Sequence, residues 1–423
     1  MHLMLNSMTL LAPGQSDGRR AQAFSLSSVR VTALLLGLMG CEREVTLPPG
    51  LSWDTEPPDY LGQARLAVTN NGDDTLAFVS LDTPVQPRLL GLANVGDNPI
   101  DLEGPHHLMA SPDGRFIYFN LSNYVVNGGS GPHGAHGTGT VPGYLIKLDV
   151  QTNQSVGRVL VDRSPGDIIL SADGRRAFVS HYDLARFRDQ LVQGRPAAEG
   201  FSSLIIADTE SMQLLSMLPL CPTMHGMGLS KDERLLYVTC SLSDQLAVVE
   251  VADPSKPVVR SLLPIGPGAN HAGNPAYAPY ALRVHPDGLV WISNNASQDV
   301  RAFDPVQMKM DPQKVVSLTG IAMFSDFSDD GSMLYVPHQG DDRVTSIDLA
   351  TLQLRTLALP QTECLNAHEL RVLPGGSAVV VCEGDHSMRK GSLVFLDLVS
   401  WAVRGSLEVG IFPDAVIRLP PLP

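Results

Sequence analysis

Histidines are the residues of this chain whose number and spacing point most directly to chemistry. Ten of the twelve fall just before or just after short apolar runs of a repeated pattern. His106, His225 and His368 occupy one repeat position, and His181 and His338 occupy another. Imidazole is the commonest side-chain ligand for metals such as zinc, copper, iron and nickel. We therefore predict a transition-metal site, with copper favoured, that uses these five histidines.

A second interpretation of the same residues stays open. Loops on one face of a repeat protein are polar, so each histidine can be a solvated or hydrogen-bonded surface group. Duplicated repeats also inherit equivalent residues without any chemical reason. On this interpretation the histidine-rich face binds a protein partner, and the protein carries no cofactor.

The repeated pattern consists of an apolar run, a turn of the Pro-Asp-Gly type and a short strand of alternating residues. It occurs six times, for example at residues 107–114 and 282–288, and a seventh apolar run at residues 415–419 stands without the turn. Most units add a third strand that ends near an aspartate, as in residues 145–149. A four-stranded unit that recurs about every 45 residues is typical of a β-propeller blade. We predict an all-β domain over residues 64–423, a seven-bladed β-propeller.

The C-terminus is expected to close this ring. The repeats start with the second strand of blade one, residues 66–70, and the chain ends with an innermost strand, residues 414–419. Pairing of these two strands completes blade one and removes the open edges that an unclosed sheet would expose.

The propeller arrangement places the histidines relative to one another. Loops that enter innermost strands and loops that follow second strands share one face, so the ten histidines lie on that face. His106, His225 and His368 begin innermost strands, which lie nearest the axis. We expect their side chains to converge on the central channel, with His181 and His338 in the ring around them.

Two segments resemble a known family of repeats. Tyr237-Val238-Thr239-Cys240 is followed by Ser243-Asp244, and the chain ends with a Val409-Gly410-x-x-Pro413 link into the last strand. These segments resemble the YVTN family of bacterial β-propellers, the YncE-like group. The resemblance covers about residues 64–419 and implies the propeller fold. It implies no single activity, because propellers host many unrelated functions.

Four cysteines form two similar pairs. Cys221 and Cys240 lie at one end of a predicted hairpin, and Cys364 and Cys382 lie at the equivalent place in another blade. In an exported protein we expect each pair to form a disulfide within its blade. The alternative is that Cys240 or Cys382 binds a soft metal ion.

The N-terminal segment has the features of an export signal. Arginines 19, 20 and 30 precede an apolar run, residues 31–40, and then Cys41. This resembles a bacterial lipoprotein signal peptide over residues 1–40, which implies lipidation of Cys41. The Pro-rich residues 41–63 are predicted to be a tether. We therefore expect an outer-membrane lipoprotein that faces the periplasm or the cell surface and contacts the membrane through its lipid anchor.

Composition and motifs narrow the function. The net charge of −14 argues against nucleic acid as a partner, because phosphate binding needs a basic face. The sequence contains no nucleophile elbow, zinc-protease motif, phosphate-binding loop or haem-attachment motif, so it does not decide whether the protein is an enzyme. We predict a monomeric binding or scaffold protein of the cell envelope whose histidine-rich face binds a metal ion or a partner. The alternative is a copper- or haem-dependent periplasmic oxidoreductase.

Overall fold

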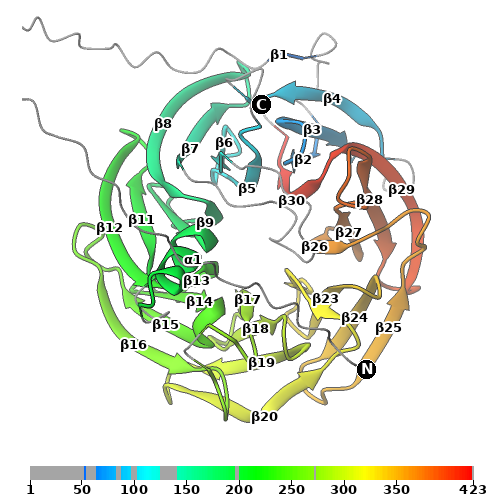
Figure 1. The fold of residues 1–423 in the computed structure, drawn as a ribbon. Helices are drawn as coiled ribbons and strands as arrows, with labels where there is room; N and C mark the ends of the chain where they lie inside the picture. Colours follow the sequence, from blue (N-terminus) through cyan, green and yellow to red (C-terminus); the bar gives the residue numbers. More distant parts are fainter. Residues whose placement is uncertain are drawn as a thin grey trace, which may run out of the picture. The chain divides into compact units, whose positions relative to one another are not determined.

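Seven antiparallel sheets surround a central axis, which confirms the predicted seven-bladed β-propeller (Figure 1). The structure is a computed structural model that describes residues 52–53, 63–81, 87–96, 102–123, 141–195, 200–270 and 273–421. The predicted lipidation site, Cys41, and the predicted signal peptide lie outside the described residues. Among those residues, no helix is long and apolar enough to cross a membrane.

Blades two to five each contain four consecutive strands, numbered from the axis to the rim. The strands of blades two and three are β5 (Pro105–Ala110), β6 (Phe116–Leu121), β7 (Pro142–Asp149), β8 (Gln154–Arg163), β9 (Pro165–Leu170), β10 (Arg176–His181), β11 (Ser202–Asp208) and β12 (Gln213–Cys221). Those of blades four and five are β13 (Met224–Leu229), β14 (Leu235–Cys240), β15 (Gln245–Glu250), β16 (Val258–Pro264), β17 (Pro279–Val284), β18 (Val290–Asn294), β19 (Asp299–Asp304) and β20 (Lys309–Ser317).

Blades six and seven complete the series. Their strands are β21 (Ile321–Ala322), β22 (Asp326–Phe327), β23 (Met333–Gln339), β24 (Arg343–Asp348), β25 (Leu354–Ala358), β26 (Ala367–Leu373), β27 (Ser377–Cys382), β28 (Lys390–Asp397) and β29 (Ala402–Ile411). The helix α1 (Leu184–Val192) follows β10, and a short 3₁₀ turn, Ser241–Ser243, follows β14.

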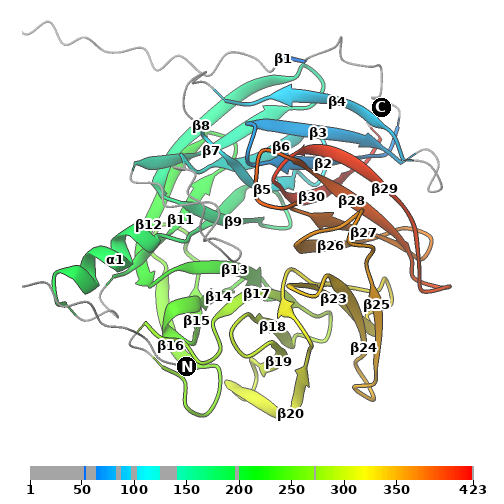
Figure 2. The same cartoon turned by 45° about the vertical axis from the view of Figure 1, so that its right-hand side comes forward.

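Blade one joins the two ends of the described chain, as the sequence predicts. It contains β4 (Leu89–Asn94), β3 (Thr75–Ser80), β2 (Arg65–Asn70) and, at the axis, β30 (Pro413–Leu419). Arg65 pairs with Leu419 and Val68 with Val416 in antiparallel register. Figures 1 and 2 show red β30 beside blue β2. The two-residue strand β1 (Ser52–Trp53), within the segment predicted to be a tether, pairs with the outer edge of β4.

The recurring turns have a common hydrogen-bond pattern. In blade two, the Ser111 hydroxyl donates to Asp113 Oδ1 at 2.5 Å and accepts from the Phe116 amide at 2.9 Å. Gly114 adopts a φ of 71°, a left-handed conformation that favours glycine. The same serine-to-aspartate bond occurs at Ser171 and Ser328. These local bonds stabilise the hairpin between the first and second strands of blades two, three, four and six, which is why the pattern is visible in the sequence.

The innermost strand of blade six is interrupted. It is divided into β21 and β22, and the segment between them turns toward blade seven. There the Phe324 amide donates to the His368 carbonyl at 3.0 Å, and the Leu370 amide donates to the Phe324 carbonyl at 3.0 Å. Phe324 thus leaves its own sheet and enters the axial region.

Both predicted disulfides are present. Cys221 is bonded to Cys240 with a Cα separation of 5.9 Å, and Cys364 is bonded to Cys382 with a Cα separation of 5.1 Å. Cys221 ends β12, the outermost strand of blade three, so its bond joins blade three to the end of β14 in blade four, whereas Cys364–Cys382 joins the segment before β26 to the end of β27 within blade seven. These four sulfur atoms are therefore not available as thiolate ligands, and the alternative of a cysteine-ligated metal is wrong for the oxidised protein.

Candidate metal centre

Six of the innermost strands begin with the same backbone irregularity. In β5, Pro105 pairs with Leu121 and Leu108 with Phe119, so His106 and His107 together oppose the single residue Asn120. This is a β-bulge, which redirects the side chains of a strand. Equivalent register shifts occur in β9, β13, β17, β26 and β30.

A residue with positive φ precedes each bulge by two positions. These residues are Gly104, Ser164, Thr223, Ala278, Asn366 and Phe412, with φ between 49° and 58°. The left-handed residue turns the chain sharply from the rim into the innermost strand. The residue two positions later then faces the axis, which explains why His106, His225, His368 and Asp414 meet there.

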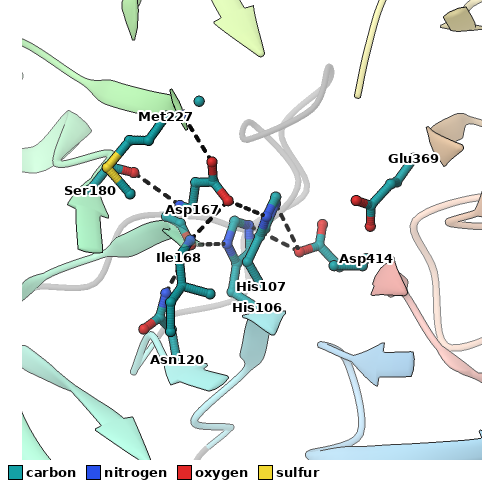
Figure 3. Close-up of polar contacts among 12 residues, drawn as sticks. His106, His107, Asn120, Asp167, Ile168, Ser180, Met227, Glu369 and Asp414 are labelled. Atoms are coloured by element: carbon teal, nitrogen blue, oxygen red, sulfur yellow. Dashed lines mark hydrogen bonds and ion pairs between the residues drawn. The ribbon is translucent and has the colours of Figure 1, made fainter. Parts of the chain in front are cut away.

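Three histidines at the axis bind an oxygen acceptor through the same ring nitrogen. His106 Nδ1 lies 3.1 Å from the Gly166 carbonyl oxygen, and His107 Nδ1 lies 3.1 Å from Asp167 Oδ1 (Figure 3). His368 Nδ1 lies 2.8 Å from the backbone carbonyl oxygen of Asp414. Because these oxygens accept hydrogen bonds, Nδ1 carries the proton in each ring. In the neutral ring, Nε2 therefore has a lone pair that can bind a proton or a metal ion.

The Asp414 side chain lies opposite two of these Nε2 atoms. Its Oδ2 is 3.2 Å from His106 Nε2 and 3.9 Å from His107 Nε2 (Figure 3). All three side chains are buried. Two lone-pair atoms at 3.2 Å repel each other unless a proton or a cation lies between them. The contact between Asp414 Oδ2 and His106 Nε2 therefore requires a proton or a cation between the two atoms.

Burial determines the protonation of Asp414. It raises the pKa of the Asp414 carboxyl to about 8, and the His107 ring opposes this increase. The carboxylates of Glu383, Glu369 and Asp167 raise the pKa further. At neutral pH and without a metal ion, the Asp414 carboxyl therefore holds a proton, which it can donate to His106 Nε2.

His225 and an aromatic cluster complete the first group of ligands. The His225 ring stacks on Tyr280 with centroids 4.3 Å apart, and its centroid is 5.2 Å from that of His107. Phe324 packs against His107 at 4.6 Å. His106, His107 and His225 each offer one ring nitrogen, and these three nitrogens lie within 4.8 Å of one another. We call these three residues the histidine group.

A second group lies on the other side of Asp414. It consists of His368, Glu383 and Asp414, each of which offers one ligand atom within 4.8 Å of the others. His368 Nε2 is 3.3 Å from the Tyr280 hydroxyl and 3.7 Å from Glu383 Oε1. We call these residues the mixed group, because it combines one imidazole with two carboxylates.

Two carboxylates at the axis, Glu383 and Glu369, are paired with basic side chains. Burial lowers the pKa of His386, but the hydrogen bond from its Nε2 to Glu383 Oε2 at 2.5 Å outweighs this effect, and the net pKa is raised. Burial raises the pKa of Glu369 to about 7, opposed chiefly by Arg283. Glu369 Oε1 is also 2.6 Å from an Arg371 nitrogen. The axial region thus contains several buried carboxylates, of which Glu369 is paired with arginines.

The structure brings together some of the predicted ligands and not others. His106, His225 and His368 converge at the axis, divided between the histidine group and the mixed group. His107, which the sequence prediction did not include, lies between them: its ring centroid is 5.2 Å from that of His225 and 6.2 Å from that of His368. Asp414 and Glu383 are further ligand candidates that the prediction missed.

His181 and His338 belong to neither group. His181 Nδ1 is 2.5 Å from the Ser203 carbonyl oxygen, and burial lowers the pKa of His181 to about 4. His338 Nε2 is 2.8 Å from Thr345 Oγ1. Both histidines end second strands and contact the third strand of their own blade. The prediction that they surround the axial site is therefore not supported by their positions.

Five other histidines were assigned to the predicted face or to its reverse. His386 contacts the mixed group through Glu383. His133, His136 and His271 lie outside the described residues. His285, predicted to lie on the opposite face, places Nε2 2.8 Å from the Gly331 carbonyl oxygen in the turn of the next blade.

Comparisons with solved structures agree with the fold. The chain is similar to the periplasmic gluconolactonase of Pseudomonas aeruginosa, with a TM-score of 0.61 and 18% identity over 84% of this chain and 99% of that one. A putative 6-phosphogluconolactonase of Bacteroides uniformis gives a TM-score of 0.60 at 13% identity, with the same coverage of 84% and 99%. A protein from Lactobacillus plantarum gives 0.61 at 16% identity, again over 84% and 99%. No protein-family model and no curated protein matches the sequence. At these identities the likeness establishes the seven-bladed propeller fold alone.

Proposed function

We propose that this protein is a cell-envelope β-propeller that binds a divalent transition-metal ion at the axial ends of its innermost strands. The observation that carries the proposal is the orientation of His106 and His107. Each ring is anchored through Nδ1 and directs Nε2 toward Asp414 Oδ2. Anchoring of the second ring nitrogen on a carbonyl or carboxylate is the usual arrangement around protein-bound metal ions.

The distances between Asp414 Oδ2 and the two Nε2 atoms are close to those between ligand atoms of one metal ion. Ligand atoms around a tetrahedral ion at 2.0–2.1 Å lie about 3.3 Å apart. The two contacts of Asp414 Oδ2, at 3.2 Å and 3.9 Å, are close to this value. His225 supplies a further nitrogen within 4.8 Å. A small shift of these side chains would therefore allow three or four of them to bind one ion.

The donor atoms restrict the choice of metal. Imidazole and carboxylate suit zinc, copper, nickel and iron, and the four cysteines that the structure describes are all in disulfides and offer no thiolate for softer ions. Among divalent ions of the first row, copper binds such sites most tightly. We therefore favour copper, with zinc as the next candidate.

The cellular setting is part of the same proposal. The segment that ends at Cys41 resembles a lipoprotein signal, and the two disulfides suit an oxidising compartment. A lipid-anchored propeller with a buried metal centre would hold or transfer a metal ion, or present a face to a partner that depends on it. We propose binding without turnover as the basic activity.

Metal titration of the purified protein tests this proposal. After treatment with a chelator, the wild type should bind copper(II) and zinc(II) in equilibrium dialysis. His107→Gln should weaken binding by about a hundredfold or more, because a metal ligand counts for at least as much as the outer residues that orient it. His285→Gln is the matched control, because His285 is also hydrogen-bonded but lies at a turn of the opposite face. Absence of binding by the wild type, or an equal loss in both variants, would refute the proposal.

A further inference from the structure

Asp414 contacts histidines from different blades through its two carboxylate oxygens. Its Oδ2 is 3.2 Å from His106 Nε2 in blade two, and its Oδ1 is 3.5 Å from His368 Nδ1 in blade seven. The bulge at the start of β30 places this side chain between β5 and β26. One carboxylate therefore lies between the histidine group and the mixed group.

Glu383 gives the mixed group a ligand atom of its own. The Glu383 side chain is fully buried, and its Oε2 contacts His386. Its Oε1 has no hydrogen-bond partner in the described part of the chain and lies 3.7 Å from His368 Nε2. A buried carboxylate oxygen without a donor is costly, so it indicates a cation or a proton at this position.

The Tyr280 hydroxyl is the hydrogen-bond partner of His368 Nε2. Its oxygen is 3.3 Å from this nitrogen, which is at the long end of the range for a hydrogen bond. With Nδ1 anchored on the Asp414 carbonyl, His368 Nε2 could bind a metal ion in place of this hydroxyl.

The charges in this region also favour more than one cation. Asp167, Glu383 and Asp414 are buried close to the axis, and Glu369 beside them is paired with Arg283 and Arg371. Several buried carboxylates repel one another unless cations lie between them. A single divalent ion in the histidine group would leave Glu383 without compensation other than His386.

We propose that the axial centre holds two divalent transition-metal ions bridged by the Asp414 carboxylate. One ion binds the histidine group and Asp414 Oδ2, and the other binds His368 Nε2, Glu383 Oε1 and Asp414 Oδ1. Sites with two metal ions place them about 3.5–4 Å apart, a spacing that a bridging carboxylate can span. This assignment rests on the proposed metal-binding function, and it extends it by a second site and a defined stoichiometry.

The number of ions per chain tests the assignment. We use copper(II) and zinc(II) separately, remove free ions by dialysis and measure bound metal by elemental analysis. The wild type should retain two ions per chain. Glu383→Gln should retain one, because the amide replaces an anionic ligand of the second ion only. Glu408→Gln, an exposed carboxylate in the same blade, is the matched control and should retain two.

His368→Gln provides a second variant that should also retain one ion, and circular dichroism checks that each variant is folded. In the copper-loaded wild type, magnetic coupling between the ions should reduce the electron paramagnetic resonance signal per copper, and Glu383→Gln should restore an ordinary mononuclear signal. One ion in both the wild type and Glu383→Gln would overturn the two-metal assignment and leave the proposed function intact. No bound ion in the wild type would overturn both.

Discussion

Replacement of Asp414 by asparagine should change the pH dependence of stability in the metal-free protein. The folded-state pKa of Asp414 is about 8, whereas an unfolded aspartate titrates near 3.8. Between these values the folded protein keeps a proton that the unfolded chain has released. The free energy of unfolding therefore falls as pH rises through this window. Asparagine does not titrate, and its amide can still donate to His106 Nε2 as the protonated carboxyl does.

The size of the effect follows from the pH interval. Each pH unit within the window changes the contribution of one such group by at most about 1.36 kcal/mol. From pH 5 to pH 8 the wild type should therefore lose up to about 4 kcal/mol relative to Asp414→Asn. Coupling of the proton to His106 and His107 reduces this figure, so about 2–4 kcal/mol is expected.

Urea unfolding followed by intrinsic fluorescence, with a chelator present, measures this difference at pH 5 and pH 8. Asp287→Asn serves as the control, because Asp287 is exposed and lies at a turn on the opposite face. Its curve should keep the pH dependence of the wild type. Parallel wild-type and Asp414→Asn stabilities across the interval would show that Asp414 is not held protonated, and the description of the axial centre would fail.

Three further predictions concern the disulfide, the closure of the ring and the anchor. The double variant Cys221→Ser with Cys240→Ser should lose about 3 kcal/mol of unfolding free energy, the value expected for a closed loop of this length, and denaturant titration checks it. Deletion of residues 413–423 removes β30 and exposes the edge of β2. Gel filtration should then show aggregation, or circular dichroism should show a loss of cooperative unfolding. An unchanged unfolding midpoint would contradict the closure of the ring by β30. Cys41→Ser should move the protein from the membrane fraction to the soluble fraction and abolish palmitate labelling, whereas continued labelling would exclude Cys41 as the lipidation site.

The fold could be predicted from the sequence because its signals are local. The Ser111-to-Asp113 bond recurs in blades three, four and six, and the left-handed Gly114 has counterparts such as Gly174 and Gly331, so one turn pattern identifies most of the blades. The closing strand was predictable because residues 414–419 match the other innermost strands. The break in the innermost strand of blade six was not, because it depends on pairing between Phe324 and strand β26 of the next blade.

The site could be predicted only in part, for reasons of register and distance along the chain. The positions of His106, His225 and His368 followed from the repeat alone. The bulge that brings His107 beside His106 adds one residue to the strand, which a count of alternating residues does not reveal. A sequence signal exists, since a turn residue stands two positions before each axial residue, as Gly104 does before His106.

His181 and His338 show the limit of reasoning from equivalent positions. They lie at the ends of second strands, which are one strand farther from the axis, and their rings contact third strands instead. In blade seven the equivalent position is occupied by Cys382, and Glu383 stands one residue farther along, with its Oε1 3.7 Å from His368 Nε2. Successive side chains of a strand point in opposite directions, so a difference of one residue decides which side chain reaches the centre.

X-ray diffraction from crystals of the metal-loaded protein, recorded at the absorption edge of the bound metal, tests the proposed centre most directly. The anomalous signal should peak at the axis, about 2.0–2.2 Å from His106 Nε2, His107 Nε2 and Asp414 Oδ2. A peak at His181, at His285 or at the protein surface, with none beside Asp414, would contradict the proposed metal centre.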